Sequence, residues 1–403
     1  MIPRFQPAIG IDELRALASP PAGAVERFEH AFASHFQCTD AVAFSYGRTA
    51  LWALLQALEI ESAEVIVPAY TCSVVAHAVT LSRNTCRFVD ATLTDYNMDL
   101  DQVAAAISPA TRMVVATHLF GFPLDVDRLR AIVDDAERRY GHRIWIVQDC
   151  AHAFGARLHG RFVAAEPDIA LFGLNISKTM TSIFGGMLAT RDSGLAARIR
   201  TWRDAHARKA PAAKALARRA YLVAAAAAFQ NTVYGAVRWL QDDTPVLNRL
   251  TTAYHRDDEI RFPPDYREGM LDVEAAIGLV QLARLEEFER RRWENARHYI
   301  ATLTAPADWS MPPLVDGATY SHFVVRVADR AREIARFRRA GVQAGEVIEY
   351  SVPHLSSYAA ANDPARFPNA LLCSQHVINL PVHPTLSDAE RQRVVDAVSA
   401  AAA

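Results

Sequence analysis

The strongest constraint on the fold is an alternation of short apolar runs with helical patterns through the first 190 residues. The apolar runs are typical of short buried strands, and the segments between them repeat apolar residues at helical spacing. The runs lie at residues 65–67, 87–90, 113–116, 144–147 and 169–172, and the helical patterns at 50–58, 99–107 and 125–138. This alternation predicts an α/β domain built on a largely parallel sheet.

Beyond about residue 263 the pattern changes. One long amphipathic helix is expected from residue 270 to about 292, followed by strands near 321–326 and 377–380 and a final helix at 387–398. The chain has 403 residues, which is more than one typical domain. We therefore predict a large α/β domain of residues 1–262 and a smaller α+β domain of residues 263–403.

Composition excludes several classes of protein. Hydrophobic residues make up 51% of the chain and charged residues 22%, which predicts a globular protein. A formal net charge of −2 gives no electrostatic reason to expect a nucleic-acid partner. The five cysteines form no CxxC pair, which argues against a disulfide framework or a zinc knuckle. With no histidine cluster that predicts a metal site and no signal-peptide pattern, we expect a cytoplasmic protein without a metal.

A segment of about residues 203–250 interrupts the alternation with basic residues and then an alanine-rich apolar run at 221–239. One hypothesis is a basic helix on a membrane surface. A spanning helix is disfavoured because Gln230, Asn231 and Thr232 lie at the centre of the run. The favoured interpretation is an alanine-rich helix packed in a subunit interface or against the main domain, since an alanine-rich face is weakly apolar for lipid.

Two charged residues come directly after buried strands. Asp149 ends the apolar run at 144–147, and Lys178 follows the run at 169–172. Ligands of α/β sheets bind beyond the carboxyl ends of the strands, where both side chains can meet one ligand. A pyridoxal-phosphate enzyme needs an amine that forms an imine with the cofactor and a carboxylate that keeps the pyridine ring protonated. The sequence therefore predicts Lys178 as the catalytic residue and Asp149 as a ligand of pyridoxal 5'-phosphate.

A short turn, formed by Gly47, Arg48 and Thr49, opens the helix predicted at 50–58. Glycine permits a tight bend, and the free backbone N–H groups at the positive end of a helix suit a phosphate. A glycine turn is a weak signal by itself, because most such turns merely join two elements. We nevertheless predict that these three residues bind the cofactor phosphate.

Several motifs follow one another in a specific order along the chain. They are SYGRTAL at 45–51, VPAYT at 67–71, HLFGFP at 118–123, DCAHAFG at 149–155, SK at 177–178, GG at 185–186, MLDVEAAIG at 270–278 and LPVHP at 380–384. Together they resemble the DegT-type sugar aminotransferases, a branch of the fold-type-I pyridoxal-phosphate enzymes. The resemblance implies a mixed, mostly parallel sheet and a homodimer with active sites at the subunit interface. It also implies transfer of an amino group from an amino acid such as glutamate to a keto sugar, by family habit nucleotide-linked.

The resemblance assigns roles to three further residues. His152, where many relatives carry glutamine, would hydrogen-bond the phenolic oxygen of the cofactor and so tune its electronics. Thr71 and Ser177 lie in matching motifs and would also contact the cofactor. Without the resemblance, His152 is a lone histidine of the kind that most often serves structure.

The chain departs from the family pattern around the cofactor. Arg48 stands where relatives usually have threonine, Gly173 where they have a hydroxyl residue, and Cys72 where many have a stacking aromatic ring. Arg267 aligns with an asparagine that the partner subunit often contributes. The hypothesis is that Arg48, and Arg267 of the partner subunit, bind the phosphate instead, because guanidinium groups match phosphate geometry. The alternative is that the alignment is shifted and these arginines are solvated.

Two other functions remain open at this point. A related pyridoxal-phosphate activity such as sugar dehydration is disfavoured, because the family's dehydratases typically carry histidine at the position of Lys178. A non-catalytic regulator or scaffold is supported only by the altered phosphate pocket and by the basic, alanine-rich insertion.

Overall fold

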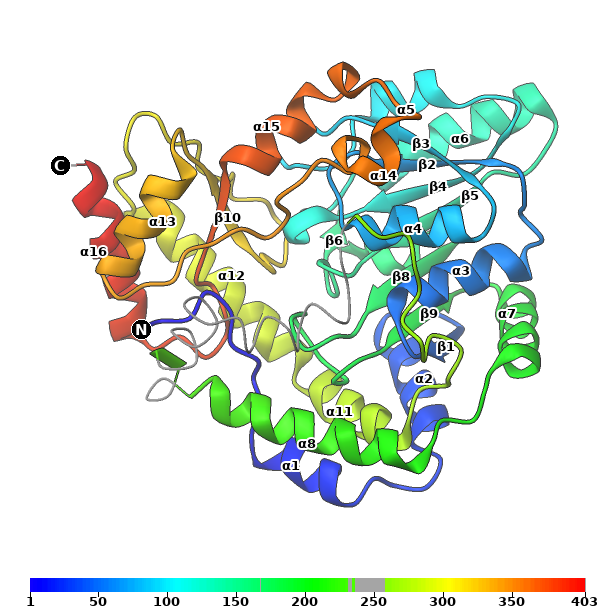
Figure 1. Ribbon diagram of the computed structural model, residues 1–403, viewed down its shortest axis with the longest axis horizontal. Helices are drawn as coiled ribbons and strands as arrows, with labels where there is room; N and C mark the ends of the chain where they lie inside the picture. The colour runs from blue at the N-terminus through cyan, green and yellow to red at the C-terminus, as the bar shows by residue number, and fades with distance from the viewer. Residues whose placement is uncertain (167, 231–233, 236–257, 403) are drawn as a thin grey trace.

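The computed structural model describes residues 1–403 except 167, 231–233, 236–257 and 403 (Figure 1). Within these residues the main sheet has seven strands in the order β1-β9-β8-β5-β4-β2-β3. The strands are β1 (Asp40–Phe44), β2 (Glu64–Pro68), β3 (Thr85–Val89), β4 (Thr111–Thr117), β5 (Trp145–Asp149), β8 (Ile169–Gly173) and β9 (Gly186–Thr190). From β3 to β8 all neighbours are parallel, and β9 runs antiparallel to both β8 and β1. The predicted mixed, mostly parallel sheet is confirmed.

Helices cover both faces of this sheet. Val65 and Val67 of β2 pack in one hydrophobic cluster with α3 and α4, whereas Ile66 between them packs in another with α5 and α6. Alternate residues of one strand thus enter opposite cores, which explains why the run is apolar throughout. The helices of this part are α1 (Ile11–Ala18), α2 (Ala24–His35), α3 (Gly47–Ala57), α4 (Ser73–Leu81), α5 (Leu100–Ala106), α6 (Val126–Tyr140), α7 (Ser193–His206) and α8 (Ala212–Ala228).

The C-terminal part is built on a small antiparallel pair, β10 (Phe323–Arg326) with β11 (Val377–Leu380). Its helices are α11 (Asp272–Ala283), α12 (Leu285–Thr302), α13 (Arg330–Arg339), α14 (Ser356–Ala359), α15 (Pro368–His376) and α16 (Asp388–Ala402). Where one long helix was expected, the structure has α11 and α12. Arg284 between them has φ −109° and ψ 0°, outside the helical range, which separates the two helices, and α12 packs against α16.

Contacts cross the predicted domain boundary between residues 262 and 263. The backbone N–H of Ile2 donates to the carbonyl of Gly341 at 2.9 Å, and the N–H of Gln343 donates to the carbonyl of Ile2 at 2.9 Å. Conversely, α11, which follows the boundary in the sequence, packs against α1 and α2, which precede it. Figure 1 accordingly shows both termini beside α16 and the small domain. The boundary itself stays a prediction.

The basic segment is divided between two helices. Arg203 and His206 belong to the end of α7, and the next helix is α8. Lys214 and Arg218 of α8 point inward, with side chains only 9% and 14% exposed, and they pair with carboxylates. A membrane-surface helix would instead present its cations to lipid headgroups. These contacts support packing against the main domain.

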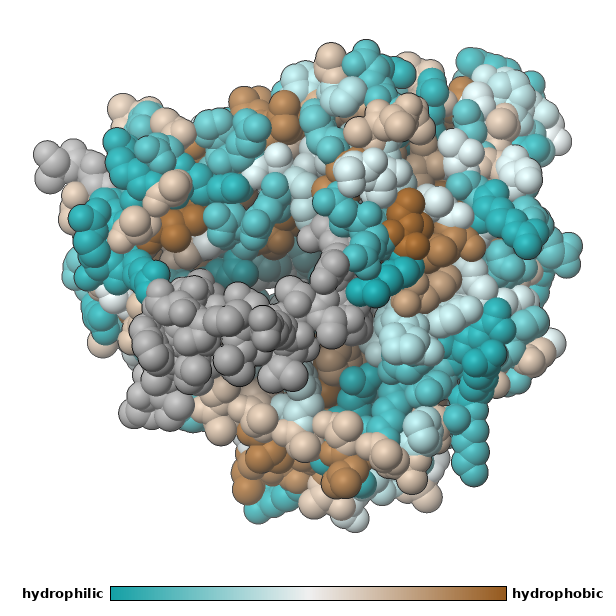
Figure 2. All heavy atoms as spheres, in the orientation of Figure 1, coloured by the Kyte–Doolittle hydropathy of each residue, from teal (hydrophilic) through white to brown (hydrophobic). Residues whose placement is uncertain are grey.

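The outer side of α8 is apolar and exposed. Leu216, Tyr221 and Val223 of α8 are exposed, as are Ile11 and Leu14 of α1, and Figure 2 shows hydrophobic surface over the two helices. The subunit-interface interpretation of the insertion therefore stays a prediction. Among the described helices, none combines the length and hydropathy needed to cross a bilayer. The remainder of the insertion at 231–233 and 236–250 lies outside the described residues.

Helix α12 is tied to the loop that follows β5 through the partly buried carboxyl group of Glu289. The backbone N–H of Gly155 donates to Glu289 Oε1 at 2.6 Å. Burial raises the pKa of Glu289 to about 7, although the Gly155 hydrogen bond and the charges of Arg157 and Arg292 act to lower it. Between pH 4.5 and about 7 the folded chain therefore keeps a proton here that the unfolded chain loses.

This proton makes the stability of the fold depend on pH. The stability that the proton on Glu289 gives to the folded chain is fully present below pH 4.5 and is lost as the pH rises to about 7. Glutamine at position 289 does not titrate, so Glu289→Gln does not lose this stability as the pH rises. Between pH 4.5 and about 7, its free energy of unfolding should therefore rise by roughly 3 kcal/mol relative to that of wild type. Urea unfolding at several pH values measures it, with Glu287→Gln, an exposed site on the same helix, as control. A difference from wild type that stays constant with pH would contradict the prediction.

Candidate active site

Two cavities meet at the carboxyl ends of β5 and β8. The first, of about 240 Å³, is lined by residues that include Gly47, Arg48, Asp149, Gly173 and Lys178. The second, of about 380 Å³, opens toward the small domain. Cys72, Asn175 and Lys178 line both. A group attached to Lys178 in the first cavity would therefore face molecules that enter the second.

Lys178 lies in the loop between β8 and β9. The neck of this loop is closed by backbone hydrogen bonds of Leu174 with Gly185 and Ser182, each 2.9 Å long. Burial lowers the pKa of Lys178, against the opposing charges of Cys72 and Asp149. A lowered pKa increases the fraction of neutral amine, which is the nucleophilic form.

The chain has only three lysines, which sharpens the assignment. Lys209 is exposed. Lys214 is engaged with Asp265 and Glu268 at 2.9 and 2.7 Å. Lys178 is thus the lysine whose amine borders the cavities.

Asp149 ends β5 and is 4% exposed. Burial raises its pKa, while the backbone N–H of Ala151 at 3.1 Å, the charge of Lys178 and the hydroxyl of Thr117 at 3.3 Å lower it. The Thr117 hydroxyl lies 3.4 Å from that of Thr71, so Thr71 supports Asp149 through one intervening side chain. A buried carboxylate in this position favours a cationic partner in the first cavity.

His152 lines the second cavity, next to Lys178. Its Nδ1 accepts the backbone N–H of Phe120 at 3.4 Å, and the two rings stack at 6.0 Å with an interplanar angle of 18°. Burial holds the pKa of His152 well below its ordinary value, and the nearby charge of Lys178 lowers it further. The ring is therefore neutral, and with Nδ1 accepting, its proton is on Nε2. A hydrogen-bond donor is what the predicted contact with the cofactor oxygen requires.

His322 is a site residue that the sequence did not reveal. Its ring lies 4.7 Å from that of His152 and borders the same cavity, and burial likewise lowers its pKa. The segment 321–326 carries only the signal of an apolar strand, and a single histidine beside such a strand has no spacing that marks function. Only the fold, which brings β10 to the second cavity, identifies it.

The predicted phosphate turn starts α3 without a side-chain cap, because Tyr46 at the N-cap makes no capping hydrogen bond. Free N–H groups at a helix start suit an anion. The buried hydroxyl of Thr49 has no hydrogen-bond partner within the described part of the chain. Arg48 is 7% exposed and borders the first cavity. Uncapped backbone groups and a buried guanidinium at the first cavity together fit a phosphate, whereas the Thr49 hydroxyl does not line that cavity.

Three predicted residues lie farther from the first cavity. Ser177 is exposed, borders only the second cavity, and donates its hydroxyl to Asn175 Oδ1 at 2.6 Å. Thr49 borders a small neighbouring cleft that also includes Arg267. Arg267 donates to the Tyr266 hydroxyl at 2.9 Å, and its guanidinium is 5.7 Å from the Trp52 ring. Within one chain, Arg267 is therefore not part of the cofactor cavity.

Comparison with known proteins agrees with this geometry. A model of the DegT/DnrJ/EryC1/StrS aminotransferase family matches residues 22–399. The chain belongs to this family. It is a pyridoxal-phosphate-dependent aminotransferase, so the family, cofactor and enzyme class predicted from the sequence are confirmed.

Solved structures show how completely the fold of this aminotransferase is shared. The sugar aminotransferase CalS13 of Micromonospora echinospora is 25% identical, with a TM-score of 0.77 over 99% of this chain and 100% of that one. AtS13 of Actinomadura melliaura is 26% identical, with a TM-score of 0.78 over 99% and 98% of the two chains. DesV of S. venezuelae, solved in complex with a ketimine intermediate, is 26% identical, with a TM-score of 0.75 over 97% and 93%.

Close backbone contact around the turn makes a test of the phosphate site possible. A Cβ atom at Gly186 would lie 2.5 Å from the backbone nitrogen of Gly47 and from the backbone of Tyr46. At Gly173 the nearest atoms would be the Cε of Lys178 at 3.6 Å and a side-chain carbon at 3.7 Å. Gly186→Ala should therefore displace the turn and raise the dissociation constant for pyridoxal phosphate at least about tenfold, consistent with overpacking costs of roughly 1–3 kcal/mol.

Gly269→Ala is the matched control, because a Cβ there would meet no atom within 4 Å and Gly269 lines neither cavity, whereas a methyl group at Gly173 would stand against Lys178 in the first cavity. Titration of the apoenzyme with pyridoxal phosphate, followed by absorbance, measures both variants. Equal affinities of Gly186→Ala and wild type would show that the turn does not hold the cofactor.

Proposed function

We propose that this aminotransferase transfers an amino group from an amino acid, with glutamate as the expected donor, to a keto sugar that is nucleotide-linked. The observation that carries the proposal is the position of Lys178, the lysine that borders both cavities. The first cavity would hold the cofactor and the second the substrates. The sugar class rests on the family and on CalS13, which is described as a sugar aminotransferase.

The cofactor, when bound, supplies an aldehyde that accepts the amino group and a ring that withdraws electrons from the reacting carbon. Asp149 would hold the ring nitrogen in its protonated form. Lys178, once its amine is released, would act as the base that moves a proton between substrate and cofactor carbons, for which a lowered pKa is suited. His152 and His322 would offer neutral N–H donors beside that amine without electrostatic repulsion.

The second cavity has the polar groups that such substrates require. Arg4 brings a cation to its lining, which suits the carboxylate of an amino acid or the phosphate of a nucleotide. Tyr350 and Asn379 add polar groups, and Asn379 Oδ1 lacks a hydrogen-bond partner among the described residues. Sugar hydroxyls are the complementary donors.

The proposal includes a homodimer in the cytoplasm. Arg267 lies away from the cofactor cavity of its own chain, so a role in phosphate binding would need Arg267 of the partner subunit. All five cysteines are unpaired, which suits a reducing compartment.

Chemical trapping tests the central assignment. Borohydride reduction of the protein with pyridoxal phosphate, followed by digestion and mass spectrometry, should label Lys178 alone among the three lysines. Lys178→Ala should lose the absorbance of the attached cofactor and release 2-oxoglutarate from glutamate, with a keto-sugar acceptor present, more slowly by at least roughly 10²–10⁴-fold.

Lys209→Ala is the control for a lysine substitution, since Lys209 is exposed and remote from both cavities. Labelling of Lys209 or Lys214 in place of Lys178 would refute the assignment. Labelling of Lys178 without amino transfer to any keto sugar would refute the acceptor class alone.

A further inference from the structure

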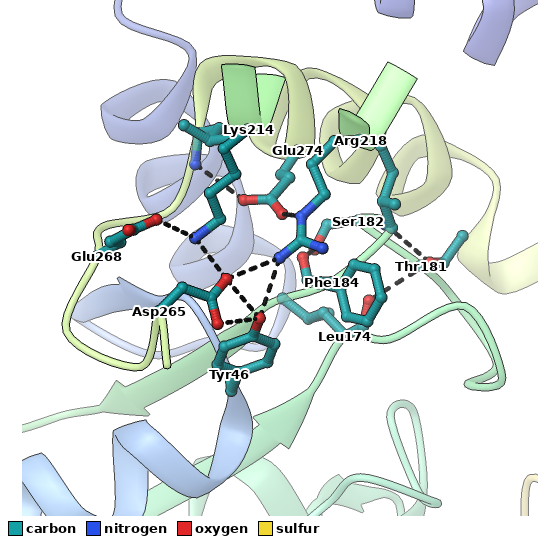
Figure 3. A network of polar contacts seen from close by, with 12 residues as sticks. Tyr46, Leu174, Thr181, Ser182, Phe184, Lys214, Arg218, Asp265, Glu268 and Glu274 are labelled. Atoms are coloured by element: carbon teal, nitrogen blue, oxygen red, sulfur yellow. Dashed lines mark hydrogen bonds and ion pairs between the residues drawn. The ribbon is translucent and has the colours of Figure 1, made fainter. Parts of the chain in front are cut away.

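Helix α8 brings two cations into the protein on one face. Lys214 and Arg218 are four residues apart, so their side chains leave the helix on the same side. Opposite them are Asp265 and Glu268, which precede α11, and Glu274 in its first turn. Figure 3 shows these side chains linked in one network, of which Asp265 and Arg218 reach Tyr46, the residue before the predicted phosphate turn. These residues are called the α8 network below.

The ion pairs of the α8 network are close and largely buried. Lys214 Nζ lies 2.9 Å from Asp265 Oδ2 and 2.7 Å from Glu268 Oε2. Arg218 Nε donates to Glu274 Oε1 at 2.9 Å, and its Nη2 lies 3.2 Å from Asp265 Oδ2. The Glu274 side chain is only 1% exposed. Buried pairs of this kind lose much of their stability when one partner is removed, because the other charge is left uncompensated.

The network ends on a hydroxyl group. Tyr46 Oη donates to Asp265, with oxygen–oxygen distances of 2.8 and 2.7 Å, and accepts from Arg218 Nη2 at 3.0 Å. Tyr46 is the N-cap of α3, so its backbone leads directly into Gly47. Fixing this ring therefore fixes the start of the turn proposed to bind the phosphate.

The same network also contacts the lysine loop. The Arg218 guanidinium lies 4.0 Å from the centre of the Phe184 ring, a cation–π distance, and that ring lies 6.0 Å from the Tyr46 ring. Phe184 immediately precedes Gly185, which closes the neck of the loop carrying Lys178. One arginine of α8 thus touches both segments that would hold the cofactor (Figure 3).

We propose that Arg218 and Lys214 are positioning residues for the cofactor, which hold Tyr46 and Asp265 so that the phosphate turn is set against the lysine loop. The inference rests on the proposed phosphate site. It makes α8 a working part of the cofactor site rather than an appended helix. The competing interpretation is that the network only fastens α8 to the protein, in which case its loss would affect stability and not cofactor binding.

Two substitutions separate these interpretations. Tyr46→Phe removes only the hydroxyl that links the network to the turn, and Arg218→Ala removes the central cation. Each should raise the dissociation constant of the apoenzyme for pyridoxal phosphate about tenfold. The double variant should have about the same dissociation constant as the weaker-binding single variant, because both substitutions break the same connection. Titration followed by absorbance gives the constants, and thermal unfolding of each apoenzyme shows whether it is folded.

Arg219→Ala is the matched control on the same helix. Its guanidinium donates to the carbonyl of Leu17 at 3.0 Å and is not part of the α8 network. We expect wild-type affinity for this variant. An equal loss of affinity in Arg219→Ala, unchanged affinity in Tyr46→Phe, or additive effects in the double variant would each overturn the inference. If Arg218→Ala does not fold, Tyr46→Phe alone decides.

The failure of this inference is distinguishable from failure of the proposed function. A wild-type protein that is not labelled at Lys178 by pyridoxal phosphate and borohydride would remove the proposed site. A wild-type protein labelled at Lys178, together with Tyr46→Phe and Arg218→Ala of wild-type affinity, would remove the positioning role alone.

Discussion

Burial of two opposite charges at one edge of the sheet is the constraint on which the rest of the site depends. Desolvation raises the pKa of Asp149 and lowers that of Lys178, so each group is pushed toward its neutral form, and each is held back by the other's charge. A heteroaromatic ring with a protonatable nitrogen and a reactive aldehyde would suit both groups at once, because the nitrogen would pair with the carboxylate and the aldehyde would take the amine. The parallel strands supply this geometry because β5 and β8 are neighbours whose carboxyl ends open on the same side.

The surrounding backbone is packed so closely that side chains are excluded from it. The beginning of β9 touches the start of α3 at Gly186, and the end of β8 approaches the same turn, where a Cβ at Gly47 would lie 3.2 Å from the Cα of Gly173. Glycine at these crossings lets the phosphate turn and the lysine loop lie against each other. Gly173 adds no side chain to the first cavity, while the buried Arg48 brings a guanidinium to it.

The sequence predicted those elements whose signal is local. Five neighbouring strands of the sheet, from β8 to β3, and helices α3, α5 and α6 follow from apolar runs and helical spacing, and Asp99 and Asp125 cap α5 and α6 where those patterns begin. Strands β1 and β9 were not predicted, because their stability comes from antiparallel pairing between segments that are far apart in the sequence. Their many small residues give little local signal of a strand. The placement of Asp149 and Lys178 at one cavity was predictable, because Asp149 ends β5 and Lys178 lies in the loop after β8. His322 was not, since its place in the second cavity depends on how the small domain packs.

The basic segment is a second case in which local sequence does not reveal the partners of a side chain. In the sequence, Lys214 and Arg218 look like part of a cationic surface, because their partners Asp265, Glu268 and Glu274 are 47 to 56 residues away along the chain. Local charge patterning cannot distinguish a helix that faces lipid from one that faces buried carboxylates. The structure distinguishes them by burial: three acidic side chains face two basic ones, and the Tyr46 hydroxyl supplies a further donor to Asp265. Because that hydroxyl belongs to the residue before the phosphate turn, any change in how α8 packs is transmitted through a rigid ring to the start of α3.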